Sequence, residues 1–248
     1  MIERLYPAAA AAAAVALTPL AAAQQEQPRE GGAYTEASAS LGVAVNSGNT
    51  DSERYNANAE YLERSDGYRY VLGLEIHRGE SDGEQDVNNS RLSGSYDWFF
   101  DGAWYANSSA SWLQDRERDI RGRYVIGAGA GYQFFDNERL RLSAEAGPSY
   151  ISEEPTGGGE RTEDAALRWA LDYRQNLADS TVRLFHRHEI VVAASDAQDW
   201  FATTRTGLRL PVQGGLSASL ELSYDYDNQT TEAYHYDAAT LANLAYTW

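Results

Sequence analysis

Residues 216–227 read Leu-Ser-Ala-Ser-Leu-Glu-Leu-Ser-Tyr-Asp-Tyr-Asp, so apolar and polar side chains alternate without interruption. A period of two places one set of side chains on each face of a β-strand. The alternation recurs along the chain and is least regular near 181–193, where His186 and His188 share the parity of apolar neighbours. The pattern predicts twelve strands, near residues 34–47, 53–64, 68–78, 88–98, 103–114, 122–134, 139–151, 165–176, 181–193, 199–210, 215–227 and 237–248.

These segments are longer than the usual globular strand of about 5–6 residues. They match the roughly 9–11 residues with which a tilted strand crosses a bilayer. Short turns and longer loops alternate between them, as they do at the two rims of outer-membrane barrels. Because lipid leaves no backbone edge unpaired, we expect one closed transmembrane antiparallel β-barrel of about twelve strands. The predicted turns are 65–67, 99–102, 135–138, 178–180 and 211–214, and the predicted long loops are 79–87, 115–122, 152–164 and 228–236.

Aromatic residues gather near both ends of the predicted strands, mostly on the apolar parity. Examples are Trp98 and Trp104 toward the short turns, and Trp112 and Trp200 toward the long loops. Two aromatic girdles around an aliphatic band are typical of a bilayer-spanning barrel. A soluble lipocalin-like barrel also alternates, but its apolar residues would face inward and would need no girdles.

Residues 1–23 have the layout of a secretory signal peptide. The apolar stretch Ala8–Ala16 is followed by Ala21-Ala22-Ala23, a cleavage site of the A-x-A type. An Ala-rich soluble helix is the alternative, but Pro19 and the abrupt polar change at Gln24 count against it. We expect residues 1–23 to be removed on export, 24–33 to be a polar periplasmic leader, and 34–248 to form the barrel.

The composition excludes several classes of protein. Beyond residue 23 no apolar run approaches the roughly 20 residues of a membrane-spanning helix. The chain has 37 acidic residues against 20 basic ones, all Arg, and a formal net charge of −17, which argues against a nucleic-acid partner. It has no Cys, so disulfides and thiolate metal sites are impossible.

The last strand ends Leu244-Ala245-Tyr246-Thr247-Trp248, with an aromatic final residue and apolar groups at alternate positions before it. This ending resembles the C-terminal assembly signal of bacterial outer-membrane proteins. The resemblance implies that Leu244, Tyr246 and Trp248 are read by the barrel-assembly machinery.

Several stretches carry a wider resemblance. They include Ser47-Gly48-Asn49-Thr50 within 41–51, Glu145-Ala146-Gly147-Pro148 within 142–150, residues 127–134, Thr206-Gly207-Leu208 and the strand beginning at Asp237. Together they resemble the YdiY-like family of salt-induced outer-membrane proteins, largely a domain of unknown function, over most of residues 34–248. The resemblance implies a Gram-negative outer-membrane barrel and supplies no substrate or catalytic residues.

Polar-parity side chains are expected to point into the lumen, where the charges come to about +3. Such charges are costly unless they are paired or solvated. Two interpretations stay open: a salt-bridged plug with a structural or envelope-stress role, or a narrow pore whose Arg residues favour anions. Small residues such as Gly129, Gly131 and Gly147 would relieve crowding there. The charged set is Arg54, Arg64, Arg69, Arg91, Arg123, Arg141, Arg168, Arg174, Arg183, Arg187, Arg205 and Arg209 with Glu36, Glu60, Glu75, Asp97, Glu145, Asp172, Glu189, Glu221 and Asp225.

Most of the net negative charge falls on the predicted long loops. Solvated acidic loops explain it, and so would divalent cations that bridge to lipopolysaccharide phosphates. The stretch Asp82-Gly83-Glu84-Gln85-Asp86 is too irregular for an EF-hand, so we predict neither a metal site nor a cofactor.

An outer-membrane enzyme is the alternative from a different class. Barrel lipases need a Ser nucleophile beside a His base, and no Ser follows any of the four His residues at the spacing of a His-x-Ser pair. His235 and Asp237 could pair at a loop end, as in a barrel protease. We predict no catalytic site.

Overall fold

The computed structural model describes residues 33–46, 52–81, 84–177, 181–229 and 235–248. The predicted signal peptide, residues 24–32 of the predicted leader and the motif at 47–50 lie outside the described residues. Within the described part, no helix is long and apolar enough to cross a membrane.

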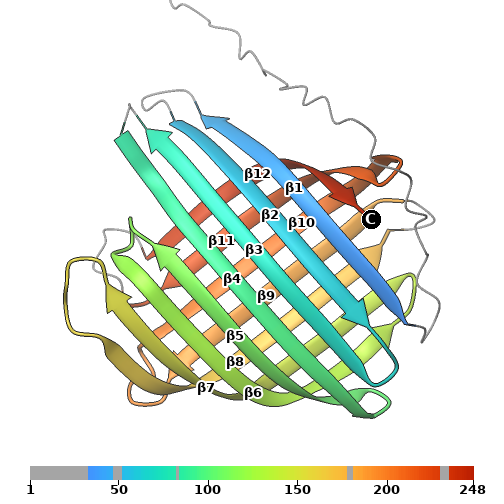
Figure 1. Ribbon diagram of the computed structural model, residues 1–248, viewed down its shortest axis with the longest axis horizontal. Helices are drawn as coiled ribbons and strands as arrows, with labels where there is room; N and C mark the ends of the chain where they lie inside the picture. The colour runs from blue at the N-terminus through green and yellow to red at the C-terminus, as the bar shows by residue number, and fades with distance from the viewer. Residues whose placement is uncertain (1–32, 47–51, 82–83, 178–180, 230–234) are drawn as a thin grey trace, which may run out of the picture.

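Twelve tilted antiparallel strands close into one barrel (Figure 1). Each strand pairs with its neighbours in sequence, and β12 closes on β1 through pairs such as Leu41 with Leu244. The predicted all-β, twelve-stranded barrel is therefore confirmed. The strands are β1 (Tyr34–Asn46), β2 (Ser52–Arg64), β3 (Tyr68–Ser81), β4 (Glu84–Asp101), β5 (Trp104–Asp115), β6 (Ile120–Asp136), β7 (Leu140–Pro155), β8 (Thr162–Asn176), β9 (Arg183–Ala193), β10 (Trp200–Gln213), β11 (Leu216–Asp227) and β12 (Tyr236–Thr247).

Several strands extend further toward the long-loop rim than predicted. The expected loop 79–87 is mostly strand, because Ser81 pairs with Glu84 and leaves only residues 82–83 between β3 and β4. The expected loop 152–164 likewise shrinks to residues 156–161. Alternation of polarity ends where neither face of a strand meets an apolar surface, whereas backbone pairing continues. The sequence pattern therefore stops before the strands do.

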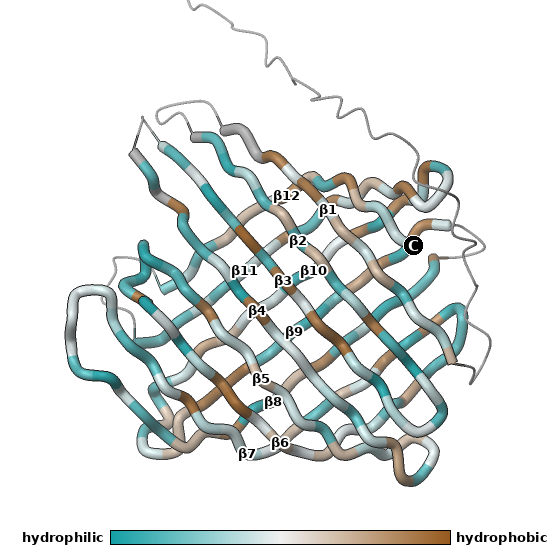
Figure 2. The backbone as a smooth tube through the Cα atoms, in the orientation of Figure 1, coloured by the Kyte–Doolittle hydropathy of each residue, from teal (hydrophilic) through white to brown (hydrophobic). Residues whose placement is uncertain are grey.

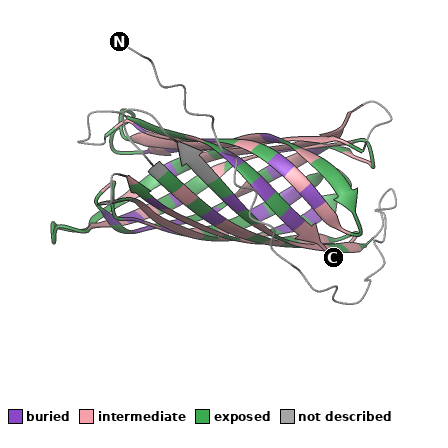
Figure 3. Ribbon diagram, turned by 90° about the horizontal axis from the view of Figure 1, so that it is seen from above, coloured by how far each residue is buried: buried purple, intermediate pink, exposed green. Residues whose placement is uncertain are grey.

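Large apolar side chains point outward from the barrel wall. Leu72 is 55% exposed and Leu220 is 53% exposed, with Val43 and Leu244 similarly placed. Apolar and polar positions alternate along the strands (Figure 2), and so do exposed and buried ones (Figure 3). This is the opposite of a lipocalin-like barrel, whose apolar residues fill the interior.

Strands β6 and β7 come unusually close around two glycines. A Cβ atom on Gly147 would lie 2.2 Å from the carbonyl oxygen of Ala128 and 2.4 Å from the Cα of Gly129. Residue pairing is interrupted there, between the pairs Gly127–Ser149 and Ala130–Ala146, which share one register, next to Pro148, which has no N–H to donate. Only glycine permits this approach of two backbones.

Candidate functional site: the charged lumen

The strand register places every residue of the predicted charge network on the inward face. Glu75 stands opposite Arg91, and Arg168 lies opposite Gly147. Arg54 faces inward opposite Gly79. The site is therefore the interior of the barrel, to which nearly every strand contributes.

The barrel is flattened, which brings opposite walls within reach of one Arg side chain. In Figure 1 strands β2 and β3 cross in front of β8 to β10, and Figure 3 shows the two walls lying close together. Glu60 of β2 lies 3.5 Å from Arg174 Nη2 of β8 and 2.5 Å from Arg187 Nη2 of β9. Arg205 of β10 reaches Glu75 of β3 at 3.5 Å. Ion pairs therefore cross the lumen and tie its two walls together.

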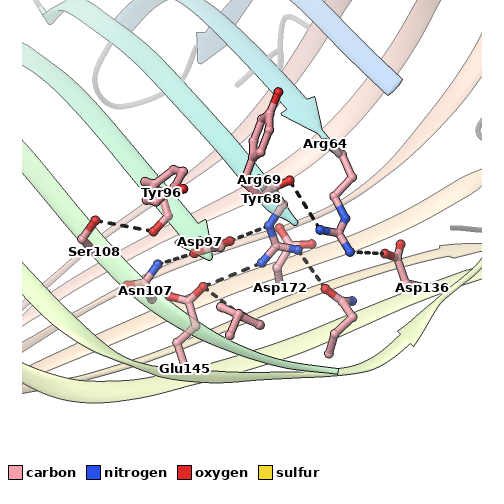
Figure 4. Close-up of polar contacts among 12 residues, drawn as sticks. Arg64, Tyr68, Arg69, Tyr96, Asp97, Asn107, Ser108, Asp136, Glu145 and Asp172 are labelled. Atoms are coloured by element: carbon pink, nitrogen blue, oxygen red, sulfur yellow. Dashed lines mark hydrogen bonds and ion pairs between the residues drawn. The ribbon is translucent and has the colours of Figure 1, made fainter. Parts of the chain in front are cut away.

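Arg69 of β3 is the centre of a second cluster (Figure 4). Its Nε donates to Asp97 Oδ2 at 2.6 Å, and its Nη1 donates to Gln133 Oε1 at 2.9 Å. Its Nη2 lies 4.0 Å from Glu145 Oε1. Asp97 is 1% exposed and also accepts from Asn107 Nδ2 at 2.6 Å. A carboxylate this deeply buried needs such a set of donors.

Glu145 extends this cluster around the barrel wall. It accepts from Arg168 Nη1 at 2.9 Å and from the Tyr105 hydroxyl at 3.1 Å. Arg168 also donates to Glu189 at 2.7 Å. The Tyr105 ring occupies the space above Gly131, where a Cβ would lie 2.1 Å from its Cζ. Gly131 therefore makes room for the Tyr105 ring, and the space that it provides is filled by this neighbour.

Not every predicted residue joins an ion pair inside the predicted set. Arg123 pairs with Glu153 and Asp227, and Arg141 pairs with Asp136. In the part of the chain that the structure describes, Arg91, Arg209 and Glu221 form no ion pair, and the buried Nε of Arg209 has no hydrogen-bond partner. Two arginines against one glutamate in this unpaired group leave a small positive excess without a direct ion-pair partner.

Two cavities lie inside the barrel. The smaller, of about 270 Å³, lies at mid-barrel among residues that include Arg69, Arg91 and Arg187. The larger, of about 1100 Å³, opens at the short-turn rim and is lined by several arginines, namely Arg64, Arg139, Arg141, Arg174, Arg183 and Arg209. Acids line both cavities as well, but arginines outnumber them, most clearly at the short-turn mouth, where the acids are Glu36, Glu63 and Glu138.

The opposite mouth is crossed by arginines that pair with acids. Arg118, in the turn between β5 and β6, lies 3.2 Å from Asp227 and 3.7 Å from Asp237, at the far side of the barrel. Arg123 of β6 also reaches Asp227, at 2.7 Å. Nearby, burial raises the pKa of the Asp199 carboxyl, and the Asp227 carboxylate raises it further. Ion pairs therefore span the long-loop mouth, and acidic residues lie around its edge.

Sequence reasoning missed part of this site. Asn107, Gln133 and Tyr105 are uncharged, so the count of lumen charges omitted them. Asp227 and Asp237 were predicted only as acids of the long-loop rim, although they follow the inward parity of β11 and β12. Arg118 lies in a turn, where alternation gives no signal for the direction of a side chain.

The histidine proposed for the enzyme alternative has other partners. His235 Nδ1 lies 3.1 Å from the carbonyl oxygen of Asp227, to which it can only donate, and its ring stacks on Tyr226. The Asp237 carboxylate is directed at Arg118 instead. Among the described residues no group of three or more His, Asp or Glu could hold a metal ion.

The chain matches a family model that carries no function. Residues 39–248 match a family described as "Protein of unknown function, DUF481". No curated protein matches the chain.

Similar solved structures are outer-membrane barrels. The NanC porin is 11% identical and has a TM-score of 0.48, with 85% of this chain and 97% of that chain covered. The translocator domain of the autotransporter NalP from Neisseria meningitidis is 12% identical, with a TM-score of 0.43 and 88% of each chain covered. An anion-selective porin from Comamonas acidovorans is 8% identical, with a TM-score of 0.41 and coverage of 87% and 99%.

Proposed function

The chain belongs to the DUF481 family, a family of unknown function. We propose that it is a Gram-negative outer-membrane barrel. We further propose that the barrel forms a narrow channel with a weak preference for anions. The location is supported by the outward apolar band and by aromatic side chains near both rims. Trp104 packs edge-to-face against Tyr132 at one rim, and Trp200 stacks on Tyr226 at the other. In this location the wall contacts outer-membrane lipid, and the acidic rim lies where divalent cations bridge lipopolysaccharide phosphates.

One observation carries the channel function. The lumen keeps cavities of about 270 and 1100 Å³ in whose linings arginines outnumber acids, and two of these arginines, Arg91 and Arg209, have no ion-pair partner among the described residues. Twelve strands lie between the eight that side chains fill and the 16–18 of open porins. The side chains therefore decide what passes, and an excess of Arg over acids favours anions.

A structural role is the second candidate. It is favoured by the ion pairs that cross the lumen, because Glu60 and Glu75 each connect opposite walls. A barrel cross-linked in this way would resist deformation without conducting.

Planar-bilayer recordings of the purified, folded protein test the channel directly. We expect stable single-channel steps whose reversal potential in a salt gradient shows anion preference. Arg91→Gln should lower the anion-to-cation permeability ratio roughly two- to fivefold, the effect of one unit charge at close range in a wet pore. Arg121→Gln is the matched control, because Arg121 is 66% exposed on the rim and pairs with Glu154. Silence would favour the structural role, and cation selectivity would contradict the proposal.

We further propose that the final residue is recognised during assembly. Trp248 also belongs to the closing seam: its N–H donates to the Ala37 carbonyl at 2.9 Å, and its ring stacks with Tyr246. Deleting Trp248 should leave most of the protein unfolded in the periplasm, as measured by the heat-modifiable barrel band in membrane fractions. Trp248→Phe, which keeps a terminal aromatic, should assemble normally.

Refolding purified protein into detergent separates recognition from barrel closure. If the machinery reads Trp248, the deletion variant should refold in detergent as well as the intact chain does. A normal amount of barrel in cells after the deletion would show that the residue is incidental.

A further inference from the structure

The outer wall of β9 and β10 carries a polar island, formed by His186, His188, Thr204 and Thr206. The register pairs His186 with Thr206 and His188 with Thr204, and the lumen-facing positions between them are taken by Arg187 and Arg205. All four island residues therefore point away from the lumen. Each is half-buried among the neighbouring side chains.

The island lies in the middle of the apolar band. Along β9 it is flanked by Leu184 and Ile190, and along β10 by Ala202 and Leu208. On the neighbouring strands Leu171 and Leu222 stand opposite His188 and Thr206. The aromatic residues Tyr173 and Tyr224 stand opposite His186 and Thr204. Hydrocarbon offers none of these polar atoms a partner, and polar groups at this depth are costly unless they are covered.

The hydrogen bonds within the island use only one nitrogen of each ring. His186 Nδ1 lies 2.7 Å from Thr206 Oγ1, and His188 Nδ1 lies 3.2 Å from Thr204 Oγ1. The two imidazoles stack with centroids 6.2 Å apart. Among the contacts of the described residues, Nε2 of either ring has no partner, so two ring nitrogens per barrel face the bilayer.

We propose that the island is the contact between two copies of this chain that lie side by side in the membrane, related by a two-fold axis along the barrel axis. The proposal rests on the membrane location proposed above. Copies inserted by the same route share one orientation and one depth, so a two-fold axis along the membrane normal sets island against island without vertical offset.

The chemistry of the island is self-complementary. When Thr donates to Nδ1, the neutral ring carries its proton on Nε2 and donates outward. When Nδ1–H donates to Thr, Nε2 accepts. One copy can therefore adopt the tautomer in which Nε2 donates, and its partner the tautomer in which Nε2 accepts, so that each Nε2 forms a hydrogen bond across the contact. Lipid chains offer no such match.

Single-cysteine variants test the contact, because the chain has no native Cys. Ala202→Cys lies beside the island and two residues from Trp200. Ala110→Cys on β5 is the matched control, because it faces outward two residues from Trp112 and lies far around the barrel. Each purified variant is reconstituted alone into phosphatidylcholine vesicles and treated with a membrane-permeable bis-thiol reagent.

We expect Ala202→Cys to give a cross-linked dimer as the main product and Ala110→Cys to give little. Adding His186→Leu and His188→Leu to Ala202→Cys should reduce the cross-linked fraction severalfold while the barrel stays folded, as its heat-modifiable mobility reports. Equal cross-linking at both cysteines, or cross-linking unchanged by the leucines, would overturn the proposal. A folded barrel that does not cross-link overturns the dimer alone, whereas a protein that never enters vesicles overturns the proposed function as well.

Discussion

Gly147→Ala should destabilise the barrel by about 1–3 kcal/mol, the usual range for inserting a group into a filled space. The added Cβ would lie 2.2 Å from the Ala128 carbonyl oxygen and 2.4 Å from the Gly129 Cα. Both obstacles are backbone, so no side-chain rotation removes them, and β6 must move away from β7. The free energy of unfolding in urea, in detergent micelles, measures the loss. A smaller amount of folded barrel in membranes should accompany it.

Gly94→Ala is the matched control. Gly94 also lies within a strand, but a Cβ there would lie 3.3 Å from the Cδ2 of Leu72, the flexible end of an outward side chain, and at an ordinary 4.0 Å from the Val71 carbonyl oxygen. This variant should keep its stability within about 0.5 kcal/mol of the original, as most surface substitutions do. Equal stabilities for the two alanine variants would show that the close approach of β6 and β7 is dispensable.

The fold was predictable because a membrane barrel repeats one simple rule along every strand. Residues 216–227 show it without interruption, and the predicted bounds of β11 differ from the observed Leu216–Asp227 by a single residue. The predicted strand ends were wrong beyond the apolar band, because polarity has no physical reason to alternate where neither face of a strand meets lipid. Beyond the apolar band, β3 and β4 continue to pair through Ser81 and Glu84, although polarity no longer alternates.

The site was predictable only as a set of inward charges. Parity placed Arg69 and Glu145 on the same face. Their partners, however, depend on how far the barrel is flattened, and no local sequence pattern predicts that flattening. The least regular segment was also informative. His186 and His188 broke the apolar pattern of β9 because they form a polar island on the outer wall.

Arg118→Ala should widen the long-loop mouth and raise single-channel conductance, roughly two- to threefold if this mouth is the narrowest part of the pore. The Arg118 side chain is 10% exposed and extends from the β5–β6 turn to Asp227 and Asp237 on the opposite side. Its removal takes away both the side chain and a charge pair that crosses the opening. Asp227 keeps its contact with Arg123, so the acid is not left unpaired.

Arg121→Ala provides the comparison, since Arg121 lies on the same rim but is 66% exposed and pairs with Glu154 rather than across the opening. Its conductance should equal that of the original chain. Salt gives a second test: Asp237 is 63% exposed, so its attraction to Arg118 is screened at high ionic strength. The ratio of the Arg118→Ala conductance to that of the original chain should therefore fall toward one in 1 M salt, once each conductance is normalised to that of the bulk solution. If Arg118→Ala does not raise the conductance at low salt, the narrowest part of the pore lies deeper, at the ion pairs of Glu60 with Arg174 and Arg187.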